Sequence, residues 1–453
     1  MNLPNYFLAD LPPEATLTPA LVAEACQTLK RNREHYLANR STANLIKVLS
    51  ETAENWLNPD YPFRQFMLAK GPEATGFSRP VLAEGLDAFF GQVTYDNLQA
   101  LLLQDLGHLQ RLDAMVGTES EQRTRQLAVA CGPELLAHVT GGVIPNPTMF
   151  SMILGILARS AQFVKCATGT SLVPRLFAHS LYDTDPKLAS CLEVAEWRGG
   201  TLALEKELFH AADCITATGS DETLADIRSR LPHHKRFLGY GHRISFGFVT
   251  HEVLSGFGAK KLAARAAVDV TAWNQLGCLS PHVLYVEHGG GTSGVRFAEL
   301  LAEELAKREE AFPRGTVSAH ESASIASKRA FYQVRADFSE ETRLWCSPES
   351  TAWTVVYEAD PRFQMSSLNR FIYVKSVSSL TEALRHVDPV RGKVSTVAIG
   401  ANSDRAEPMA MELARWGVTR VCPIGQMQNP PLTWRHDGRP SLGDIVTWTN
   451  WEM

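Results

Sequence analysis

The sequence predicts an α/β protein built on parallel sheets. From about residue 130 onward, short apolar segments alternate with segments of helical periodicity, which is the pattern of βαβ units. The first hundred residues lack this alternation and are predicted to be mostly helical. A chain of 453 residues is also too long for one hydrophobic core, so we expect two or three domains.

The N-terminal helices are marked by their apolar faces and by N-cap residues. Three helices are predicted, at 18–31, 42–57 and 94–106. Thr18 is the expected N-cap of the first. Proline and glycine clusters at 58–62 and 71–80 indicate loops between them.

The next region has strands and helices in regular alternation. Strands are expected at 135–140, 161–166, 191–196 and 213–217, and helices at 147–159, 172–182, 201–211 and 221–231. Connections of this length between parallel strands are right-handed. We interpret the region as a Rossmann-type domain.

A second α/β series begins near residue 247. Helices are expected at 254–270, 295–311 and 406–416, and strands at 283–286, 354–357, 371–374 and 396–399. Gly417 is the predicted C-cap of the last helix. The remaining tail is rich in proline and tryptophan and is expected to be ordered.

Composition argues against several classes of protein. The formal net charge is -5, and no dense basic stripe occurs, so DNA or RNA is not expected as a partner. The eight cysteines form no C-x-x-C pair and there is no H-E-x-x-H motif, so no metal site is predicted. Scattered cysteines of this kind are typical of reduced thiols in a cytosolic protein.

The sequence shows no secretory signal and no membrane span. The N-terminus is acidic and contains proline, whereas a signal peptide is basic and then apolar. The longest apolar stretch, 149–164, is interrupted by Arg159 and Gln162 and is too short to cross a bilayer. We therefore expect a cytoplasmic protein.

Cys278 is the candidate nucleophile. It follows Gly277, which leaves room for a substrate to approach the backbone, and lies between a predicted helix and a predicted strand. A thiolate attacks a carbonyl or thioester when its position favours ionisation, for example beside a helix N-terminus. Most single cysteines are instead small buried hydrophobes, so the residues alone leave both interpretations open.

Two strand ends carry residues that suit a phosphate or a ribose. Lys165 ends an apolar strand and is followed by small hydroxyl residues, including Thr168. Gly219 and Ser220 follow another strand and open a helix, where unpaired N–H groups favour anions. A surface lysine and an ordinary βα turn are the commoner explanations of such residues.

Three further segments have weaker signals. The turn at 239–243 is either a cofactor contact or an interdomain hinge. The glycine-rich segment 289–294 lacks the lysine of a phosphate-binding loop, so we predict a mobile loop. His282 is positioned to be a base for Cys278, but a packed or solvated histidine is the commoner case.

Together these segments resemble the acyl-CoA reductase (LuxC-like) family of the aldehyde dehydrogenase superfamily. The matching segments are 138–145 (HVTGGVIP), 163–165 (FVK), 197–200 (WRGG), 218–220 (TGS), 241–247 (GHRISFG), 275–281 (QLGCLSP), 422–425 (CPIG), 429–431 (NPP) and 434–439 (WRHDGR). No single segment is decisive, but their order and spacing are specific.

The resemblance implies an aldehyde dehydrogenase-like fold, with a Rossmann-type cofactor domain, an α/β catalytic domain and a small oligomerisation element. On this basis, residues 1–246 hold the helical N-terminal segment and the dinucleotide-binding domain. Residues 247–425 form the catalytic domain, and residues 426–453 form a docking segment. The active site is expected in the cleft between the first two domains.

The resemblance also assigns roles to residues. Cys278 matches the nucleophilic cysteine, and its backbone N–H is expected to contribute to the oxyanion site. Lys165 matches the lysine that contacts the adenosine ribose. Gly219 and Ser220 match the turn at the pyrophosphate.

The sequence departs from the superfamily pattern at three positions. Gly239 lies where hydrolytic members have a glutamate base, which favours acyl-thioester reduction over oxidation to a free acid. Thr168 replaces an acidic residue that repels a 2′-phosphate, so we predict NADPH rather than NADH. Val143 occupies the place of the oxyanion asparagine, and Asn146 lies nearby but offset.

The expected function is therefore reduction of an acyl thioester, either acyl-CoA or a carrier-bound acyl group, to an aldehyde with hydride from NADPH. One alternative is an acyltransferase or thioesterase that uses only the acyl-enzyme step. Another is a non-catalytic partner in a biosynthetic complex. The resemblance favours a homo-oligomer or membership of such a complex.

Overall fold

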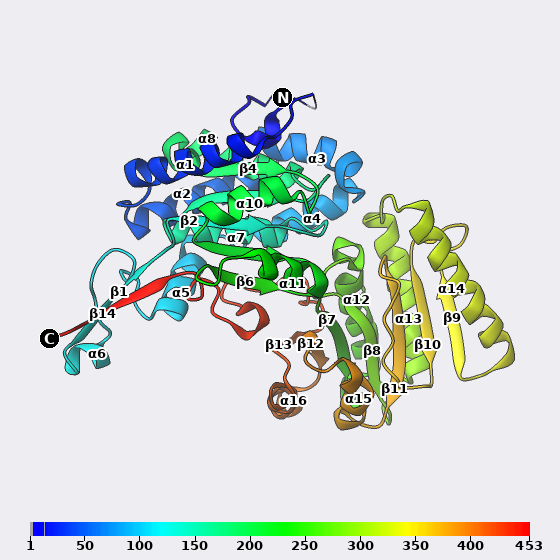
Figure 1. The fold of residues 1–453 in the computed structure, drawn as a ribbon. Helices are drawn as coiled ribbons and strands as arrows, with labels where there is room; N and C mark the ends of the chain where they lie inside the picture. Colours follow the sequence, from blue (N-terminus) through cyan, green and yellow to red (C-terminus); the bar gives the residue numbers. More distant parts are fainter. Residues whose placement is uncertain (1–2, 13) are drawn as a thin grey trace. The chain divides into compact units, whose positions relative to one another are not determined.

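The computed structural model describes residues 3–12 and 14–453, and the chain divides into two compact units (Figure 1). Unit 1 comprises the chain up to Thr75 together with 86–241 and 431–453, and unit 2 comprises 76–85 and 242–430. The division differs from the predicted ranges. A junction at 246/247 would cut β7 (Ile244–Val249), which is an inner strand of the unit 2 sheet and cannot be split without breaking its pairing.

Unit 1 contains a five-stranded parallel sheet in the order β4-β3-β2-β5-β6. Its strands are β2 (Leu135–Val139), β3 (Ala161–Cys166), β4 (Leu192–Glu196), β5 (Cys214–Thr218) and β6 (Arg236–Tyr240). The chain moves outward from β2 to β4, then returns to β5 on the other side. The carboxyl ends of β2 and β5 therefore lie at a topological switch point, where open α/β sheets bind ligands.

The longer helices of unit 1 are α1 (Pro19–Tyr36), α2 (Thr42–Leu57), α3 (Pro62–Thr75), α5 (Tyr95–Leu106), α7 (Asn146–Leu157), α8 (Leu172–Thr184), α10 (Leu202–Ala211) and α11 (Asp221–Arg230). The short ones are η1 (Leu8–Asp10), α6 (Glu119–Arg123), α9 (Pro186–Ala189) and η5 (His436–Gly438). Helices α1, α7, α8, α10 and α11 pack against this sheet, and α2, α3 and α5 pack against other helices. α4 (Arg79–Phe90) lies where the chain passes from unit 2 back to unit 1.

Cap residues define several of these helices. Thr18 caps α1, accepting a hydrogen bond from the backbone N–H of Leu21 at 3.2 Å, as predicted. The predicted loop at 71–80 is wrong in part, because 71–75 are the last residues of α3 and α4 begins at Arg79. α3 is helical through Pro72, which the sequence pattern treats as a helix breaker. Packing against α8 stabilises this helix despite its proline.

A two-stranded antiparallel ribbon also belongs to unit 1. β1 (Gln126–Cys131) pairs with β14 (Thr447–Glu452), and residues 431–453 of the predicted docking tail belong to this unit, whereas 426–430 belong to unit 2. Every residue of β14 is exposed. Arg236 on β6 anchors the segment before β14 by donating to the carbonyl oxygens of Ile445 and Val446 at 2.7 and 2.8 Å.

Unit 2 contains a seven-stranded sheet in the order β13-β12-β7-β8-β11-β10-β9, parallel except for β9. Besides β7, its strands are β8 (Pro281–Glu287), β9 (Thr342–Cys346), β10 (Thr354–Glu358), β11 (Phe371–Val377), β12 (Val394–Gly400) and β13 (Arg420–Pro423). β8 and β11 are buried along their whole length. The predicted strands at 283–286, 354–357, 371–374 and 396–399 are confirmed, whereas β7, β9 and β13 were not predicted.

Helices cover both faces of this sheet. One core contains residues of α12 (Phe257–Thr271) and α13 (Gly294–Ala311), and the other contains residues of α14 (Ala319–Phe338), α15 (Leu380–Val387) and α16 (Ser403–Trp416). Short 3-10 helices are η2 (His251–Val253), η3 (Ala272–Gln275) and η4 (Asp388–Val390). Gly417 ends α16 in the left-handed conformation at φ 115°, which confirms the predicted C-cap.

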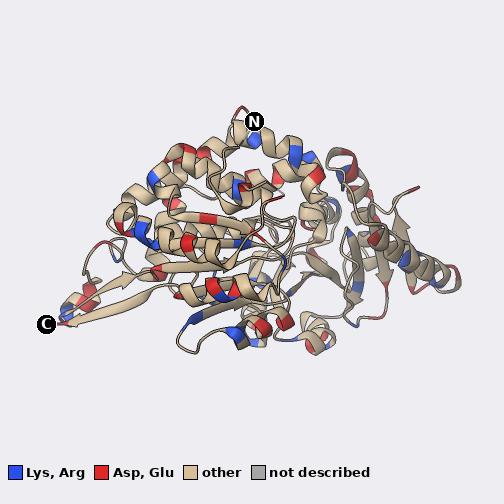
Figure 2. Ribbon diagram, turned by 45° about the horizontal axis from the view of Figure 1, so that its top comes forward, with Lys and Arg blue, Asp and Glu red and all other residues tan. Residues whose placement is uncertain are grey.

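Charged residues of both signs are interspersed along the helices (Figure 2). Within the described ranges, no helix combines the length and apolar character needed to cross a bilayer.

Candidate active site

Cys278 lies in a tight turn of unit 2 between η3 and β8, and its side chain is exposed. The backbone N–H of Ser280 donates to the carbonyl oxygen of Gly277 at 2.9 Å and closes the turn. The Oγ of Ser245 on β7 donates to the carbonyl oxygen of Cys278 at 2.8 Å. The thiol is therefore at the amino end of a buried strand rather than at a helix N-terminus, and its backbone is fixed from a neighbouring strand.

The residues before this turn adopt an uncommon backbone conformation. Trp273, Asn274 and Gln275 are consecutive left-handed residues with φ values of 48°, 52° and 64°. For residues that have a Cβ atom, this conformation costs roughly 1–2 kcal/mol each. Such strain persists only where the surroundings determine it, and it is concentrated at functional sites.

A second left-handed turn faces the first. Leu368, Asn369 and Arg370 have φ values of 57°, 52° and 66° and lead directly into β11. The Arg370 guanidinium donates to the Oδ1 of Asn274 at 2.9 Å, which joins the two turns side chain to side chain. The Nε2 of Gln275 donates to the carbonyl oxygen of Phe371 at 2.9 Å and makes a second cross-link.

His282 does not act as a base for Cys278 in this arrangement. Its side chain is 4% exposed, and burial lowers its pKa to about 4. Its Nδ1 accepts the backbone N–H of Ser366 at 3.1 Å and lies 2.9 Å from the Oγ of the same residue. The imidazole is neutral and packed, as the commoner interpretation of this residue predicts.

Arg420 is the charged residue that sequence reasoning missed near Cys278. It is 8% exposed at the start of β13 and donates to the carbonyl oxygens of Met427 and Gln426 at 2.6 Å each. Burial lowers the pKa of this guanidinium, while the negative charges of its neighbours, Cys278 included, act in the opposite direction. The charge of Arg420 therefore acts at the position of Cys278.

Lys165, Thr168, Gly219 and Ser220 all lie at the carboxyl edge of the unit 1 sheet, as predicted for these strand ends. Lys165 is 3% exposed, and its Nζ lies 6.0 Å from the centre of the Trp197 ring. Burial lowers the pKa of this lysine.

Thr168 is exposed in the loop after β3, but an acidic residue reaches this loop from the neighbouring strand. The Glu196 carboxylate accepts the backbone N–H groups of Gly169 and Ser171 at 2.8 and 3.3 Å. Glu196 is the last residue of β4. Its position beside this loop follows from the pairing of β4 with β3, and the sequence around Thr168 does not indicate it. Arg198 follows Glu196 by two residues and is exposed. Its carbonyl oxygen accepts hydrogen bonds from Thr201, while its guanidinium pairs with no side chain among the described residues.

Gly219 and Ser220 form the turn between β5 and α11. The Oγ of Ser220 caps the helix by accepting the N–H of Thr223 at 3.2 Å, and the N–H of Gly219 donates to the Tyr240 carbonyl oxygen at 3.3 Å. The N–H of Gly141, after β2, donates to the Oγ1 of Thr218 at 3.0 Å. These bonds join the two strand ends at the switch point.

This edge of unit 1 fits a dinucleotide. A Cβ placed on Gly142, Gly169 or Gly200 would meet no other atom within 4 Å, so the backbone there is open to a close ligand. The Trp197 Nε1 is buried and has no hydrogen-bond partner among residues 3–12 and 14–453, which leaves a donor for a ligand. A lysine, an arginine and open glycines at a switch point are the features that such cofactors use.

The departures from the superfamily pattern are also visible in unit 1. Val143 is 45% exposed, whereas the Oδ1 of Asn146 is buried without a hydrogen-bond partner. A Cβ on Gly239 would lie 3.0 Å from the Phe237 ring, so β6 has little room for a glutamate here. The Gly239 carbonyl oxygen instead accepts Arg439 at 3.0 Å.

The tail of unit 1 forms an aromatic stack that sequence reasoning missed. The rings of Tyr240 and His436 are stacked at 4.5 Å, and Trp434 lies 4.7 Å from His436. The Arg439 guanidinium lies over the Tyr240 ring, 4.6 Å from its centre. The Trp434–Arg439 motif therefore packs on the end of β6.

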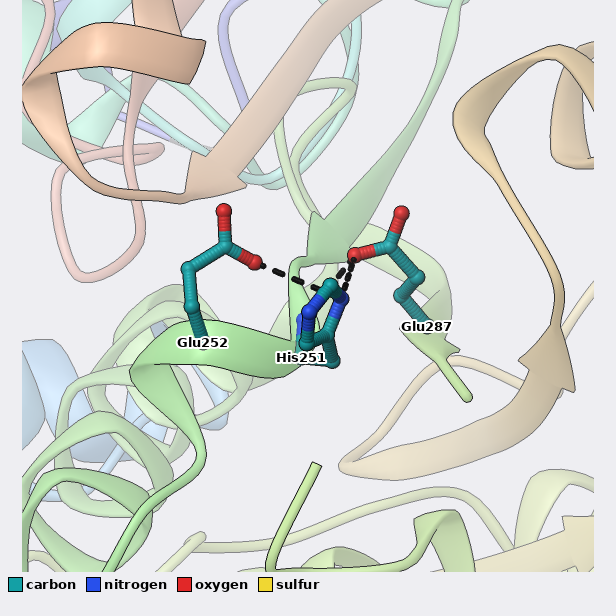
Figure 3. A group of neighbouring side chains, drawn as sticks. All are labelled: His251, Glu252 and Glu287. Carbon is teal, nitrogen blue, oxygen red and sulfur yellow. Dashed lines mark hydrogen bonds and ion pairs between the residues drawn. The ribbon is translucent and has the colours of Figure 1, made fainter. Parts of the chain in front are cut away.

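A group of possible metal ligands lies at the carboxyl edge of the unit 2 sheet, formed by His251, Glu252 and Glu287 (Figure 3). The Nδ1 of His251 is 2.7 Å from Glu287. Arg405 pairs with both carboxylates, at 2.9 Å from Glu252 and 2.7 Å from Glu287. Burial opposes ionisation of Glu287, but hydrogen bonds from Arg405 and His251 outweigh it and lower its pKa to about 2. The carboxylates thus already have a cation, and we interpret the group as an ion-pair network.

Comparison with known proteins supports one family. The model of the family described as acyl-CoA reductase (LuxC) matches residues 37–448. A long-chain acyl-protein thioester reductase of Photorhabdus luminescens is 22% identical over 420 residues, covering 90% of this chain and 82% of that protein. Long-chain acyl-protein thioester reductase 2 of Photobacterium leiognathi is 22% identical over 320 residues, and the match spans 70% of this chain but only 63% of the relative's length.

Solved structures show the same fold. The indole-3-acetaldehyde dehydrogenase AldA of P. syringae, solved with NAD+ and IAA, superposes with a TM-score of 0.73 at 13% identity, covering 97% of this chain and 90% of that one. The aldehyde dehydrogenase KauB of Pseudomonas aeruginosa gives 0.72 at 14% identity, covering 98% and 91%. The α/β fold predicted from the sequence is confirmed as that of the aldehyde dehydrogenases. Because the family model matches most of its length, the chain belongs to the LuxC acyl-CoA reductase family.

Proposed function

We propose that this protein reduces an acyl thioester to an aldehyde, with Cys278 as nucleophile and NADPH as hydride donor. The observation that carries the proposal is an exposed thiol on a backbone turn fixed from β7 and attracted by the buried cation of Arg420. An exposed thiol beside a cation is the environment of a reactive cysteine rather than of a buried structural one.

In the proposed reaction, the Cys278 thiolate attacks the thioester carbonyl carbon. The C–S bond to CoA or to a carrier thiol breaks, the thiol leaves, and the acyl group remains as a thioester on Cys278. When bound, NADPH supplies the hydride that reduces this acyl carbon to the aldehyde level. The bond to the Cys278 sulfur then breaks and the thiolate is regenerated, while the departed thiolate takes its proton from water.

The absence of a carboxylate at Gly239 supports reduction over hydrolysis. Hydrolysis of an acyl-enzyme needs a base that activates water, and Gly239 supplies no side chain for that role. Displacement of a thiol needs no such base, because thiolates are good leaving groups.

The preference for NADPH rests on charge around the loop after β3. Thr168 supplies no carboxylate, and Glu196 has its charge engaged by two backbone N–H groups. Arg198 and Lys165 provide the cations, and an arginine at this edge is the usual partner of a 2′-phosphate. Lys165 would contact the adenosine ribose, and the turn at Gly219 and Ser220 would lie at the pyrophosphate.

The acyl donor is proposed to be acyl-CoA or a carrier-bound acyl group. Relatives named long-chain acyl-protein thioester reductases support a protein-linked donor. The exposed ribbon of β1 and β14 supports a homo-oligomer, because an exposed edge strand pairs readily with another chain.

The test is the purified protein with long-chain acyl-CoA and NADPH, followed by loss of absorbance at the nicotinamide band and by mass analysis of the acylated protein. We expect aldehyde in equal amount to NADPH consumed, and a trapped acyl group on Cys278 when NADPH is left out. Wild-type turnover by a Cys278→Ala variant would overturn the proposal.

The two alternatives give different results in the same assay. An acyltransferase or thioesterase would cleave the thioester at an unchanged rate without NADPH. A non-catalytic partner would be folded yet bind no NADPH by calorimetry. Either result would replace the reductase proposal.

A further inference from the structure

We propose that Arg370 is a positioning residue for Cys278, acting through Asn274 to hold the turn that carries the thiol. This inference rests on the proposed function of Cys278. It concerns a residue that does not contact the thiol but determines the backbone leading to it.

Arg370 is a fully buried cation with two distinct partners. Its side chain is 0% exposed. One guanidinium nitrogen donates to Glu309 on α13 at 2.6 Å, and the other donates to the Oδ1 of Asn274 at 2.9 Å. The planar guanidinium has fixed donors on two sides, which suits an arginine to bridge Glu309 and Asn274 in a way that the single ammonium group of a lysine does not.

Asn274 is held from both ends of its amide. Its Nδ2 donates to the carbonyl oxygen of Arg314 at 2.6 Å, while its Oδ1 accepts from Arg370. The Arg314 N–H in turn donates to the carboxylate of Glu309 at 3.2 Å, so the same acid supports both sides. The side chain in the middle of the left-handed turn is therefore completely engaged by buried groups.

This network is close to the thiol along the chain. Asn274 is four residues before Cys278, with only Gln275, Leu276 and Gly277 between them. A residue with a Cβ atom leaves the left-handed conformation for a lower-energy backbone conformation unless contacts with its surroundings prevent this. Loss of the Arg370 contact would release Asn274, and the turn that presents Cys278 would shift with it.

A displacement of the nucleophile lowers the rate of the chemical step more than it lowers the affinity for the substrate. Misplacement by about 1 Å can lower a rate by about 100-fold, even when the altered residue is remote from the chemistry. We expect Arg370→Met to lower kcat by roughly 10- to 100-fold, while KM for acyl-CoA changes by less than about 3-fold.

Two further variants separate positioning from stability. Asn274→Ala removes the acceptor but leaves the Arg370–Glu309 pair, so it tests the same contact without depriving Glu309 of its ion-pair partner. Arg405→Met is the control. Arg405 likewise bridges two side chains in unit 2, the acids Glu252 and Glu287, but it lies at the carboxyl edge of the sheet, whereas Cys278 lies at the amino edge.

The experiment measures four quantities for wild type, the three variants and the Arg370→Met/Asn274→Ala double variant: kcat, KM, the unfolding midpoint and the rate of Cys278 alkylation by iodoacetamide. If Arg370 positions the turn, the Arg370 and Asn274 variants should both have a lower kcat and a changed alkylation rate. Their effects on kcat should not be additive in the double variant. Arg405→Met should lower only the unfolding midpoint.

The results distinguish failure of this inference from failure of the proposed function. If Cys278→Ala abolishes turnover but both Asn274→Ala and Arg370→Met keep wild-type kcat, Arg370 has no positioning role. The same conclusion follows if kcat falls equally in Arg405→Met at a matched loss of stability, or if the two single effects simply add. If Cys278→Ala keeps its turnover, the proposed function itself is overturned.

Discussion

Ser245 connects the Cys278 turn to the interior of the unit 2 sheet. Its Oγ donates to the carbonyl oxygen of Cys278 at 2.8 Å and accepts the backbone N–H of Thr396, on β12, at 3.2 Å. Ser245 is 0% exposed and lies on an inner strand. One hydroxyl therefore ties a turn that bears an exposed thiol to two of the most rigid elements of the unit.

Replacement of Ser245 by alanine is expected to lower kcat by about 10-fold, because it releases the carbonyl oxygen of Cys278. It also leaves the buried Thr396 N–H without a partner, which should lower the unfolding free energy by about 1–3 kcal/mol. Steady-state kinetics and urea unfolding measure the two effects. Thr250→Ala is the control, because its buried hydroxyl bonds Gly400 at the other edge of the sheet. Equal kcat losses in both variants would contradict a specific role for Ser245.

The charge of Arg420 is expected to set the reactivity of Cys278. In Arg420→Met, alkylation of the thiol should shift to higher pH and slow by about 10-fold at pH 7, because the thiolate loses its neighbouring cation. Arg420→Lys keeps the charge and should lie close to wild type. Rates of iodoacetamide alkylation between pH 6 and 9 measure the shift, and superimposable profiles for all three proteins would refute it.

Arg198 is expected to select NADPH. Arg198→Ala should raise KM for NADPH by about 10-fold or more and leave KM for NADH within about 2-fold, because only NADPH has the 2′-phosphate that this cation would bind. Arg123→Ala is the control, since Arg123 is an exposed arginine elsewhere in unit 1. A parallel change for both nucleotides would show that Arg198 does not read the phosphate.

His138 is expected to make stability depend on pH. Burial lowers its pKa to about 4 in the folded protein, whereas an unfolded histidine titrates near 6.5. The unfolded chain thus binds a proton at this residue that the folded chain does not, so the contribution of His138 to the unfolding free energy is fully present above pH 6.5 and is lost as the pH drops toward 4. Urea unfolding at pH 7.5, 6 and 5 measures the slope.

His138→Gln should flatten that slope, because the residue no longer titrates. His210→Gln provides the comparison, as His210 is exposed on α10. An unchanged slope in the His138 variant would assign the pH dependence to other groups.

The β1–β14 ribbon is expected to hold copies of the chain together. Trp451 is 53% exposed on β14, so Trp451→Lys should place a charge on the joining surface and reduce the assembly to monomers. Light scattering after size exclusion gives the mass. Glu452 is the next residue and lies on the other face of the strand, so Glu452→Lys should keep the wild-type mass. Identical masses for wild type and Trp451→Lys would disprove the role of this ribbon in assembly.

Local patterns were sufficient to predict much of the fold. Helices with clear caps, such as α1 with Thr18 and α16 with Gly417, were predicted because their signals lie within a few residues. Buried parallel strands such as β3 were recognisable as apolar runs between helices. The exposed thiol and the lysine at a strand end were chosen from residue type and position, with support from family resemblance.

Long-range contacts determined what the sequence could not predict. β14 pairs with β1, more than 300 residues earlier, so neither strand has a local signal that distinguishes it from a loop. Glu196 reaches the loop beside Thr168 only because β4 is the neighbour of β3.

The surroundings of Cys278 show the same limit. The sequence alone gives its residue type and its place before a strand, and these two features made it a candidate nucleophile. Arg420, Ser245 and Arg370 reach its turn from three other strands or strand ends, between 33 and 142 positions away in sequence. Burial and hydrogen bonding act through space, so only the folded sheet shows which distant side chains surround the turn that carries Cys278.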